Sequence, residues 1–149
     1  LPYCHRLNNL AELYRQMGDY EKALPLYQRS LDISEKVLGP QHPDVAQTLN
    51  NLAGLYYNMG DYEKALPLYQ RALDIREKVL GPQHPDVAAT LNNLGLLYDN
   101  MGDYEQALPL YQRALEICEK ILGPKHPKTI IVRNNFMQST NNREEKKEN

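Results

Sequence analysis

A repeat of 42 residues constrains the fold of this chain more than any other feature of its sequence. The motif LGP-x-HP occurs three times, and consecutive copies lie 42 residues apart. Residues 7–48 and 49–90 are identical at 36 of 42 positions, and residues 91–132 match the second copy at 29 of 42. A fixed period of this length is typical of solenoids, in which each unit buries its apolar face only by stacking on its neighbours.

One unit has the pattern of two helices. In the second copy, apolar residues recur at i, i+3, i+4 and i+7 from Val45 to Met59, which predicts a first helix, helix A. Gly60 suits the end of helix A, and Asp61 suits the cap of a second helix. A second apolar stripe runs from Tyr62 to Leu80 and predicts helix B, which Gly81 closes. The expected fold class is therefore all-α, built from antiparallel helical hairpins.

Pro67 lies inside the predicted helix B, as do the equivalent Pro25 and Pro109. An interior proline costs a regular helix on the order of 3 kcal/mol. We therefore expect a distorted or late-starting first turn in helix B. The apolar stripe continues through the proline, so we do not expect a broken helix.

The spacing of small and aromatic residues in the second unit resembles the tetratricopeptide repeat. Two departures accompany the match: Leu49 replaces the usual early Trp, and Glu77 replaces the proline that usually closes helix B, which lengthens the unit from 34 to 42 residues. The residues that carry the resemblance are Leu52, Ala53, Tyr56, Gly60, Ala65, Tyr69 and Ala72.

The 42-residue form is most similar to the repeats of kinesin light chains and of related bacterial and archaeal arrays. The resemblance implies a right-handed superhelical solenoid of three repeats plus a C-terminal capping helix. It also implies that a protein or peptide binds in a concave groove lined by the A helices. The expected array spans residues 1–138, with helix pairs at about 1–38, 43–80 and 85–122 and a terminal helix at about 127–138. The polar tail, residues 139–149, lacks apolar side chains, and we expect it to be disordered.

Differences between the near-identical units concentrate on one face of helix A. At 100° per residue, Leu49, Leu52 and Ala53 gather on one side of the helix, and Asn51 and Gly54 lie opposite. A groove tuned repeat by repeat would show such variation, and so would a solvated surface that drifts. The candidate groove residues are Asn9, Glu12, Gln16, Gln47, Asn50, Asn51, Gly54, Asn58, Asn93, Leu96 and Asn100.

Each helix A carries two adjacent asparagines, although asparagine is a mediocre helix former. An amide side chain can donate to and accept from the backbone of an extended peptide without reading its sequence. Alternatively, it can bond a neighbouring helix and fix the stacking. For Asn50 the two roles remain equally open, whereas Asn51 lies closer to the centre of the variable face and favours the groove role.

Other chemistry finds little support in the sequence. His42 and its two equivalents recur too far apart to share a metal ion, because successive hairpins are separated by about 8–10 Å, so we assign them a turn role. There is no phosphate-binding loop, nucleophile elbow or paired catalytic acid. We therefore expect no enzymatic activity and no cofactor. Arg15 is the only basic residue on the variable face, which disfavours a clamp for an acidic chain terminus.

Composition limits the partners and the compartment. The net charge of -2 predicts no attraction to nucleic acid or to anionic membranes, and no apolar run approaches the ~20 residues of a membrane span. Cys4 and Cys118 lack metal-ligand spacing and are expected to be reduced thiols of a cytoplasmic protein.

Two functions follow from these observations. The first is a non-catalytic scaffold that binds a peptide or protein segment in the groove of A helices. The alternative is a structural array that associates end to end, because the first helix A has no preceding helix B in this sequence. In that case Leu7, Leu10 and Tyr14 should be partly uncovered.

Overall fold

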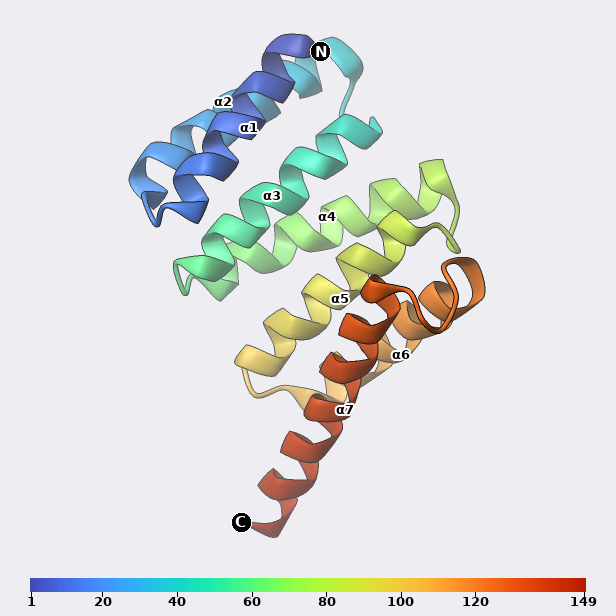
Figure 1. Cartoon of the computed structure of the whole chain (residues 1–149). Helices are drawn as coiled ribbons and strands as arrows, with labels where there is room; N and C mark the ends of the chain where they lie inside the picture. The colour runs from blue at the N-terminus through green and yellow to red at the C-terminus, as the bar shows by residue number, and fades with distance from the viewer. The chain divides into compact units, whose positions relative to one another are not determined.

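The computed structural model describes all 149 residues and consists of seven α-helices without any strand (Figure 1). The helices are α1 (Pro2–Gln16), α2 (Tyr20–Leu38), α3 (Pro43–Asn58), α4 (Tyr62–Leu80), α5 (Pro85–Asn100), α6 (Tyr104–Ile121) and α7 (Pro127–Glu148). The predicted all-α class and the repeated helical hairpins are confirmed. None of the helices is both long and apolar enough to span a membrane.

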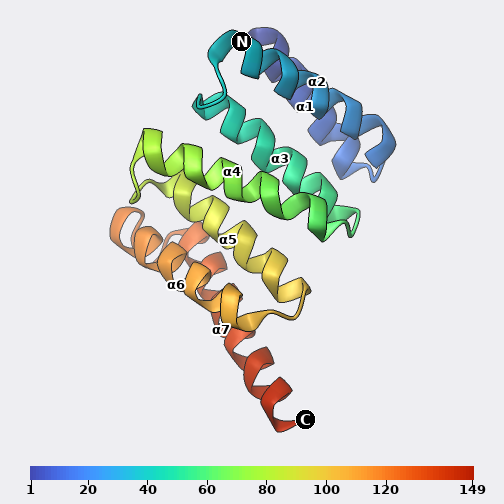
Figure 2. The ribbon, with the colours of Figure 1, turned by 180° about the vertical axis from the view of Figure 1, so that it is seen from behind.

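The chain divides into two compact units, Leu1–Val79 and Leu80–Asn149. The first unit contains α1, α2, α3 and nearly all of α4, and the second contains α5, α6 and α7. Within each unit, consecutive helices run antiparallel, as the pairs α1–α2 and α5–α6 show from either side (Figures 1 and 2).

The HP motif sets the start of the A helices. The Nδ1 atom of His42 accepts a hydrogen bond from the backbone N–H of Asp44 at 3.0 Å, and Pro43 is the first helical residue. This first position tolerates proline because its N–H would lack a helical partner anyway. The same cap recurs at His84 and His126, so these histidines have the turn role that the sequence predicts.

The turn between helices A and B depends on a glycine in the left-handed region. Gly18 has a φ of 78° and follows the end of α1. Residues with a Cβ rarely adopt this conformation. The carboxylate of Asp19 then accepts a hydrogen bond from the N–H of Lys22 at 3.4 Å and caps α2. The sequence GDY therefore specifies where one helix ends and the next begins.

The late start expected for helix B is wrong. Helix α4 begins at Tyr62, five residues before Pro67, and continues to Leu80. The proline removes one backbone donor, whose acceptor would be the carbonyl of Glu63 in the first turn. Glu63 and Pro67 are both exposed, so water can bond to that carbonyl. The proline therefore destabilises the helix less here than it would at a buried position.

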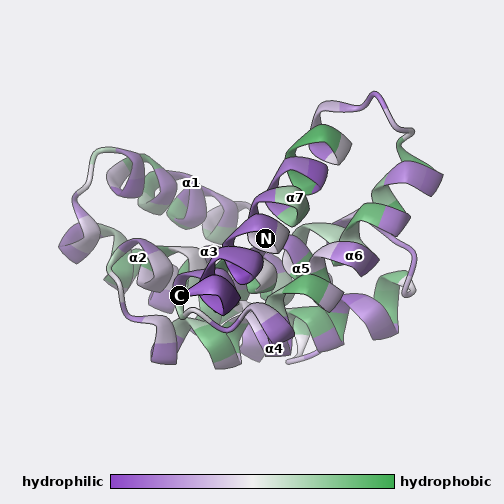
Figure 3. Ribbon diagram, turned by 90° about the horizontal axis from the view of Figure 1, so that it is seen from below, coloured by the Kyte–Doolittle hydropathy of each residue, from purple (hydrophilic) through white to green (hydrophobic).

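Two clusters form the core of the first unit. One joins α1, α2 and α3 through Ala11, Ala23, Tyr27, Leu52 and Leu55. The other joins α3 and α4 through Val45, Ala46, Leu49, Ala72 and Ile75. Alanine at several of these positions lets the helices approach closely. Figure 3 shows hydrophobic and hydrophilic residues sharing the same helices, as expected for amphipathic segments.

The prediction of a disordered tail after Gln138 is wrong, because α7 runs to Glu148. The hydroxyl of Ser139 is buried and donates to Oδ1 of Asp99 on α5 at 2.6 Å. Near the end of α7, Nζ of Lys146 donates to the carbonyl of Gly102 at 2.9 Å. Composition alone suggested disorder, but these contacts with α5 and its C-terminal turn hold the last part of α7, residues 139–148, which has no apolar residues of its own.

Candidate peptide-binding site

In the first unit, an arginine connects the variable faces of α1 and α3. Nε of Arg15 donates to Oδ1 of Asn58 at 2.8 Å, and Nη1 donates to Oε2 of Glu12 at 3.2 Å. Nε2 of Gln16 donates to the other oxygen of Glu12 at 3.3 Å. The structure therefore brings together three of the predicted groove residues around one guanidinium group.

Gly54, one of the predicted groove residues, lies beneath a side chain of the preceding helix A. It is buried, and a Cβ added to it would lie 3.1 Å from Nη1 of Arg15. The helical wheel placed Gly54 on the correct face but could not show that a side chain from the preceding helix A covers it. Its role is to leave room for the Arg15 guanidinium.

Buried tyrosines of the B helices reach the same polar face, and the sequence analysis missed them. The hydroxyl of Tyr27 donates to Oε2 of Glu12 at 2.8 Å, and the hydroxyl of Tyr111 donates to Oδ2 of Asp99 at 2.7 Å. Burial raises the pKa of Tyr27 above its usual value, and the bond to Glu12 and its negative charge raise it further. The tyrosines recur every 42 residues, but their acidic partners occupy different repeat positions, so no sequence signal linked them.

The first asparagine of the pair bonds a neighbouring helix A. Nδ2 of Asn8 on α1 donates to Oγ1 of Thr48 on α3 at 3.0 Å. In the second unit Val132 takes the threonine position, and Asn92 instead accepts from Nδ2 of Asn135 at 3.0 Å. Both bonds connect adjacent A helices within one unit, so Asn8 and Asn92 take part in helix stacking.

The second asparagine is more accessible to a ligand. Asn9 is exposed, and Asn51 is half-buried. Oδ1 of Asn51 accepts from Nε2 of Gln47 at 3.0 Å, and Oε1 of Gln47 accepts from Nη2 of Arg76 at 2.8 Å. Since Arg76 is only 4% exposed, this relay starts from a fixed charge and orients the Asn51 amide with its two N–H donors left for another acceptor.

The equivalent face of the second unit is less polar. Leu96 is half-buried, and Nδ2 of Asn100 donates to the Leu96 carbonyl at 2.8 Å within α5. Asn93 borders a small, mostly apolar cavity of about 210 Å³ that also reaches Cys118 and Ile131. Burial raises the pKa of the Cys118 thiol, and the charge of Lys128 opposes this shift.

Cys4 and Cys118 are both free and buried. No three His, Cys, Asp or Glu side chains of the structure lie together as metal ligands do. In each unit the A helices present hydrogen-bonding side chains, and side chains of the B helices bond to several of them.

Comparisons with known proteins agree with this architecture. A family model described as the tetratricopeptide repeat matches residues 4–78, 44–108 and 100–136. No curated protein matches the sequence.

Similar solved structures include BtubC (BKLC) from P. vanneervenii, at 29% identity and a TM-score of 0.86, covering 93% of this chain and 56% of that one. A putative kinesin light chain from Podosopora anserina has 24% identity and a TM-score of 0.87, over 97% and 68% of the two chains. The Sgt2 TPR domain from Aspergillus fumigatus has 23% identity and a TM-score of 0.73, over 100% and 84%. The chain thus spans little more than half the length of BtubC.

Proposed function

This chain belongs to the tetratricopeptide repeat family, and from that premise we propose that it is a non-catalytic scaffold that binds an extended segment of a partner protein. The binding surface in the first unit is the polar face of α1 and α3, which carries Asn9, Glu12, Gln16, Asn51 and Asn58. Folds of this family commonly serve in protein–protein interaction, and the finer assignment rests on the side chains of this surface.

The observation that carries the proposal is the oriented amide of Asn51. A ligand backbone carbonyl can accept from an N–H donor that Gln47 and the buried Arg76 hold in place. An oriented donor loses little side-chain entropy when the ligand binds, which favours affinity. Asn9 presents a second amide on α1. Such donors bind a peptide main chain, while the changing neighbours Glu12 and Leu96 would give each repeat its own selectivity.

The proposal predicts that replacing Asn9 and Asn51 together with Ala weakens binding without unfolding the protein. Each lost hydrogen bond is worth about 0.5–1.5 kcal/mol, so affinity should fall by roughly one to two decades. The thermal midpoint should hold or rise, because Ala is the better helix former by up to about 0.7 kcal/mol per site. The ligand for this measurement is a peptide selected from a random library on the unmodified chain, and binding is measured by fluorescence anisotropy.

Asn8→Ala is the matched control, because Asn8 sits beside Asn9 but bonds Thr48 of the next helix A. This variant should melt at a lower temperature and still bind the selected peptide with unchanged affinity while folded. An early melt of the double variant with unchanged affinity would instead assign these asparagines to helix stacking and refute the binding surface.

A second candidate function, end-to-end self-association, is favoured by the outer face of α1. Tyr3, Leu10 and Leu13 are 45%, 42% and 53% exposed, whereas their equivalents in the second and third repeats are at most 4% exposed. The expectation that Leu10 and Tyr14 are partly uncovered is correct, but Leu7 is buried. Its equivalent Leu49 is also buried, in the core between α3 and α4. Sedimentation showing a monomer over a wide concentration range would eliminate this candidate.

A further inference from the structure

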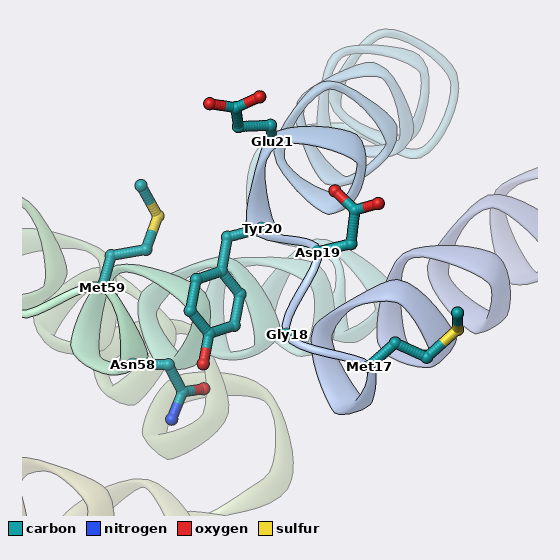
Figure 4. A pocket seen from close by; sticks show the side chains of 7 residues that line it. All are labelled: Met17, Gly18, Asp19, Tyr20, Glu21, Asn58 and Met59. Carbon is teal, nitrogen blue, oxygen red and sulfur yellow. The ribbon is translucent and has the colours of Figure 1, made fainter.

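A hollow of about 680 Å³ lies beside the turn between α1 and α2. Its walls are Met17–Glu21, the last residue of α3, Asn58, and the following Met59. Figure 4 shows the Tyr20 ring extending from the start of α2 toward Asn58, with the Glu21 carboxylate on another side. The peptide-binding face described above does not account for this hollow.

The same turn recurs in the second unit, where it holds a lysine of the chain's own α7. Nζ of Lys146 donates to the carbonyl of Gly102 at 2.9 Å and lies 5.6 Å from the centroid of the Tyr104 ring. The Gly102 carbonyl follows the C-terminus of α5, where the helix dipole favours a cation. The face of a tyrosine ring attracts a cation as well. The sequence GDYE stands at Gly18–Glu21 and at Gly102–Glu105. At Gly102 it forms a binding site for a lysine side chain.

Helix length explains why one site is filled and the other open. Helix α3 ends at Asn58, after which the chain turns into α4. Asn142 occupies the position of Asn58 in the repeat, but α7 continues past it to Glu148. The additional residues bring Lys146 over its turn. The hollow at the first turn is therefore the space that a helical continuation of α3 would occupy.

Charge at the first turn also suits a basic occupant. Glu21 is exposed and carries a carboxylate beside the hollow. Nζ of Lys22 lies 3.4 Å from Oδ2 of Asp19 and 5.5 Å from the centroid of the Tyr14 ring. This lysine therefore contacts the ring of Tyr14 and not that of Tyr20. Tyr20 and Glu21 consequently remain to face an incoming cation.

We propose that this hollow is a docking site for a basic helical turn of a partner protein. The partner's lysine would make the contacts that Lys146 of α7 makes at the Gly102 turn. The occupant carries Arg-x-x-Lys-Lys, the spacing of Arg143, Lys146 and Lys147, which line the equivalent hollow at Gly102. Its first lysine donates to the Gly18 carbonyl and lies over the Tyr20 ring. Of the residues that line the hollow, Asn58 also belongs to the proposed peptide-binding face.

The test uses the full chain, labelled with ¹⁵N, and an alanine-based helical peptide with one Arg-x-x-Lys-Lys turn. Titration should move the amide resonances of Gly18 and Tyr20. A peptide with glutamine in place of both lysines should leave them unmoved. Tyr20→Leu should weaken binding about two- to fivefold through loss of the ring face, while Tyr20→Phe, which keeps the ring, should retain affinity. Tyr104→Leu is the matched control in the second unit and should not alter binding at Gly18.

Glu21→Gln provides a variant whose fold is not at issue, because the side chain is exposed; it should weaken binding about twofold at low salt. Equal binding of the lysine and glutamine peptides would overturn the proposal. Resonance shifts confined to Gly102 and Tyr104, with displacement of Lys146, would overturn it too, since the first turn would then not be a lysine site.

Discussion

At the scale of single residues, two helix-interior glycines show how near-identical repeats accommodate different side chains. Gly54 lies under the Arg15 guanidinium, while Gly95, one repeat later and at the position of Ala53, lies against the Tyr111 ring. A Cβ on Gly95 would be 2.6 Å from Cε1 of Tyr111. The absence of that Cβ lets Tyr111 approach closely enough to donate to Asp99.

These contacts predict different effects on the free energy of unfolding for two chemically identical substitutions. Gly95→Ala should lower the free energy of unfolding by about 1–3 kcal/mol, because a rigid ring must move and its hydrogen bond is disturbed. Gly54→Ala should be nearly neutral, because the flexible end of Arg15 can shift by a few tenths of an ångström while Ala improves helix propensity. Urea denaturation of both variants measures the difference. Equal effects would contradict the assignment of Gly95 to a close helix contact.

At the scale of helices, the same leucine differs in burial according to what precedes it. Leu52 on α3 is 4% exposed and packs in a cluster with Ala23 and Tyr27 of α2. Leu10 holds the equivalent position on α1 and is 42% exposed. The apolar stripe of a helix A is therefore completed by the hairpin before it, which is the nearest-neighbour logic of repeat proteins.

Truncation of these two leucines measures that coupling directly. Leu52→Ala should cost about 2–5 kcal/mol of stability, the range for a buried leucine. Leu10→Ala should cost well under 1 kcal/mol, since surface substitutions usually stay within about 0.5 kcal/mol. Thermal and urea unfolding of the pair provide the comparison. A large cost at Leu10 would show that α1 has a partner in solution and would support self-association.

The length of α7 gives a second prediction for an element. Ser139→Ala removes the donor to Asp99 while Tyr111 still bonds that carboxylate. We expect a loss of about 0.5–1.5 kcal/mol and faster amide hydrogen exchange over residues 140–148. Thr140→Ala serves as the control, because its hydroxyl bonds only the Phe136 carbonyl of the same helix. Unchanged exchange in Ser139→Ala would mean that other contacts hold the end of α7.

At the scale of the whole molecule, each B helix buries a tyrosine, so the free energy of unfolding should decrease at alkaline pH. Burial raises the pKa of Tyr69 to about 12; the Arg15 charge opposes this shift, and Tyr57 adds to it. An unfolded tyrosine ionises near pH 10. Between these values the unfolded chain has released a proton that the folded chain keeps, so the contribution of Tyr69 is complete below pH 10 and declines as the pH rises toward 12.

Tyr69→Phe should remove this part of the pH dependence. The thermal midpoint of the unmodified chain should fall between about pH 10 and about pH 12, and the variant's midpoint should fall less steeply. Calorimetry across that range is the measurement, with Tyr3→Phe as the exposed control. If both variants follow the unmodified chain, the Tyr69 phenol ionises with an ordinary pKa.

The sequence by itself determined the helices and their order. The 42-residue period, the glycine and aspartate of each GDY turn and the proline after each histidine are local signals, and local backbone preferences suffice to place helix ends from them. The side of helix A that carries Leu49, Leu52 and Ala53 was predictable for the same reason, because one apolar face per helix must be buried.

Only the tertiary structure decided which polar side chains remain for a ligand. Arg15 covers Gly54, Asn8 bonds Thr48, and Arg76 orients Asn51 through Gln47. The residues that these contacts bring together, Asn51 and Gln47 apart, lie 29 to 40 positions from each other along the chain, and their pairing depends on side-chain reach across packed helices. Helical periodicity gives the face of a residue but not the neighbour that occupies that face, which is why the groove and the end of α7 could not be placed from the sequence.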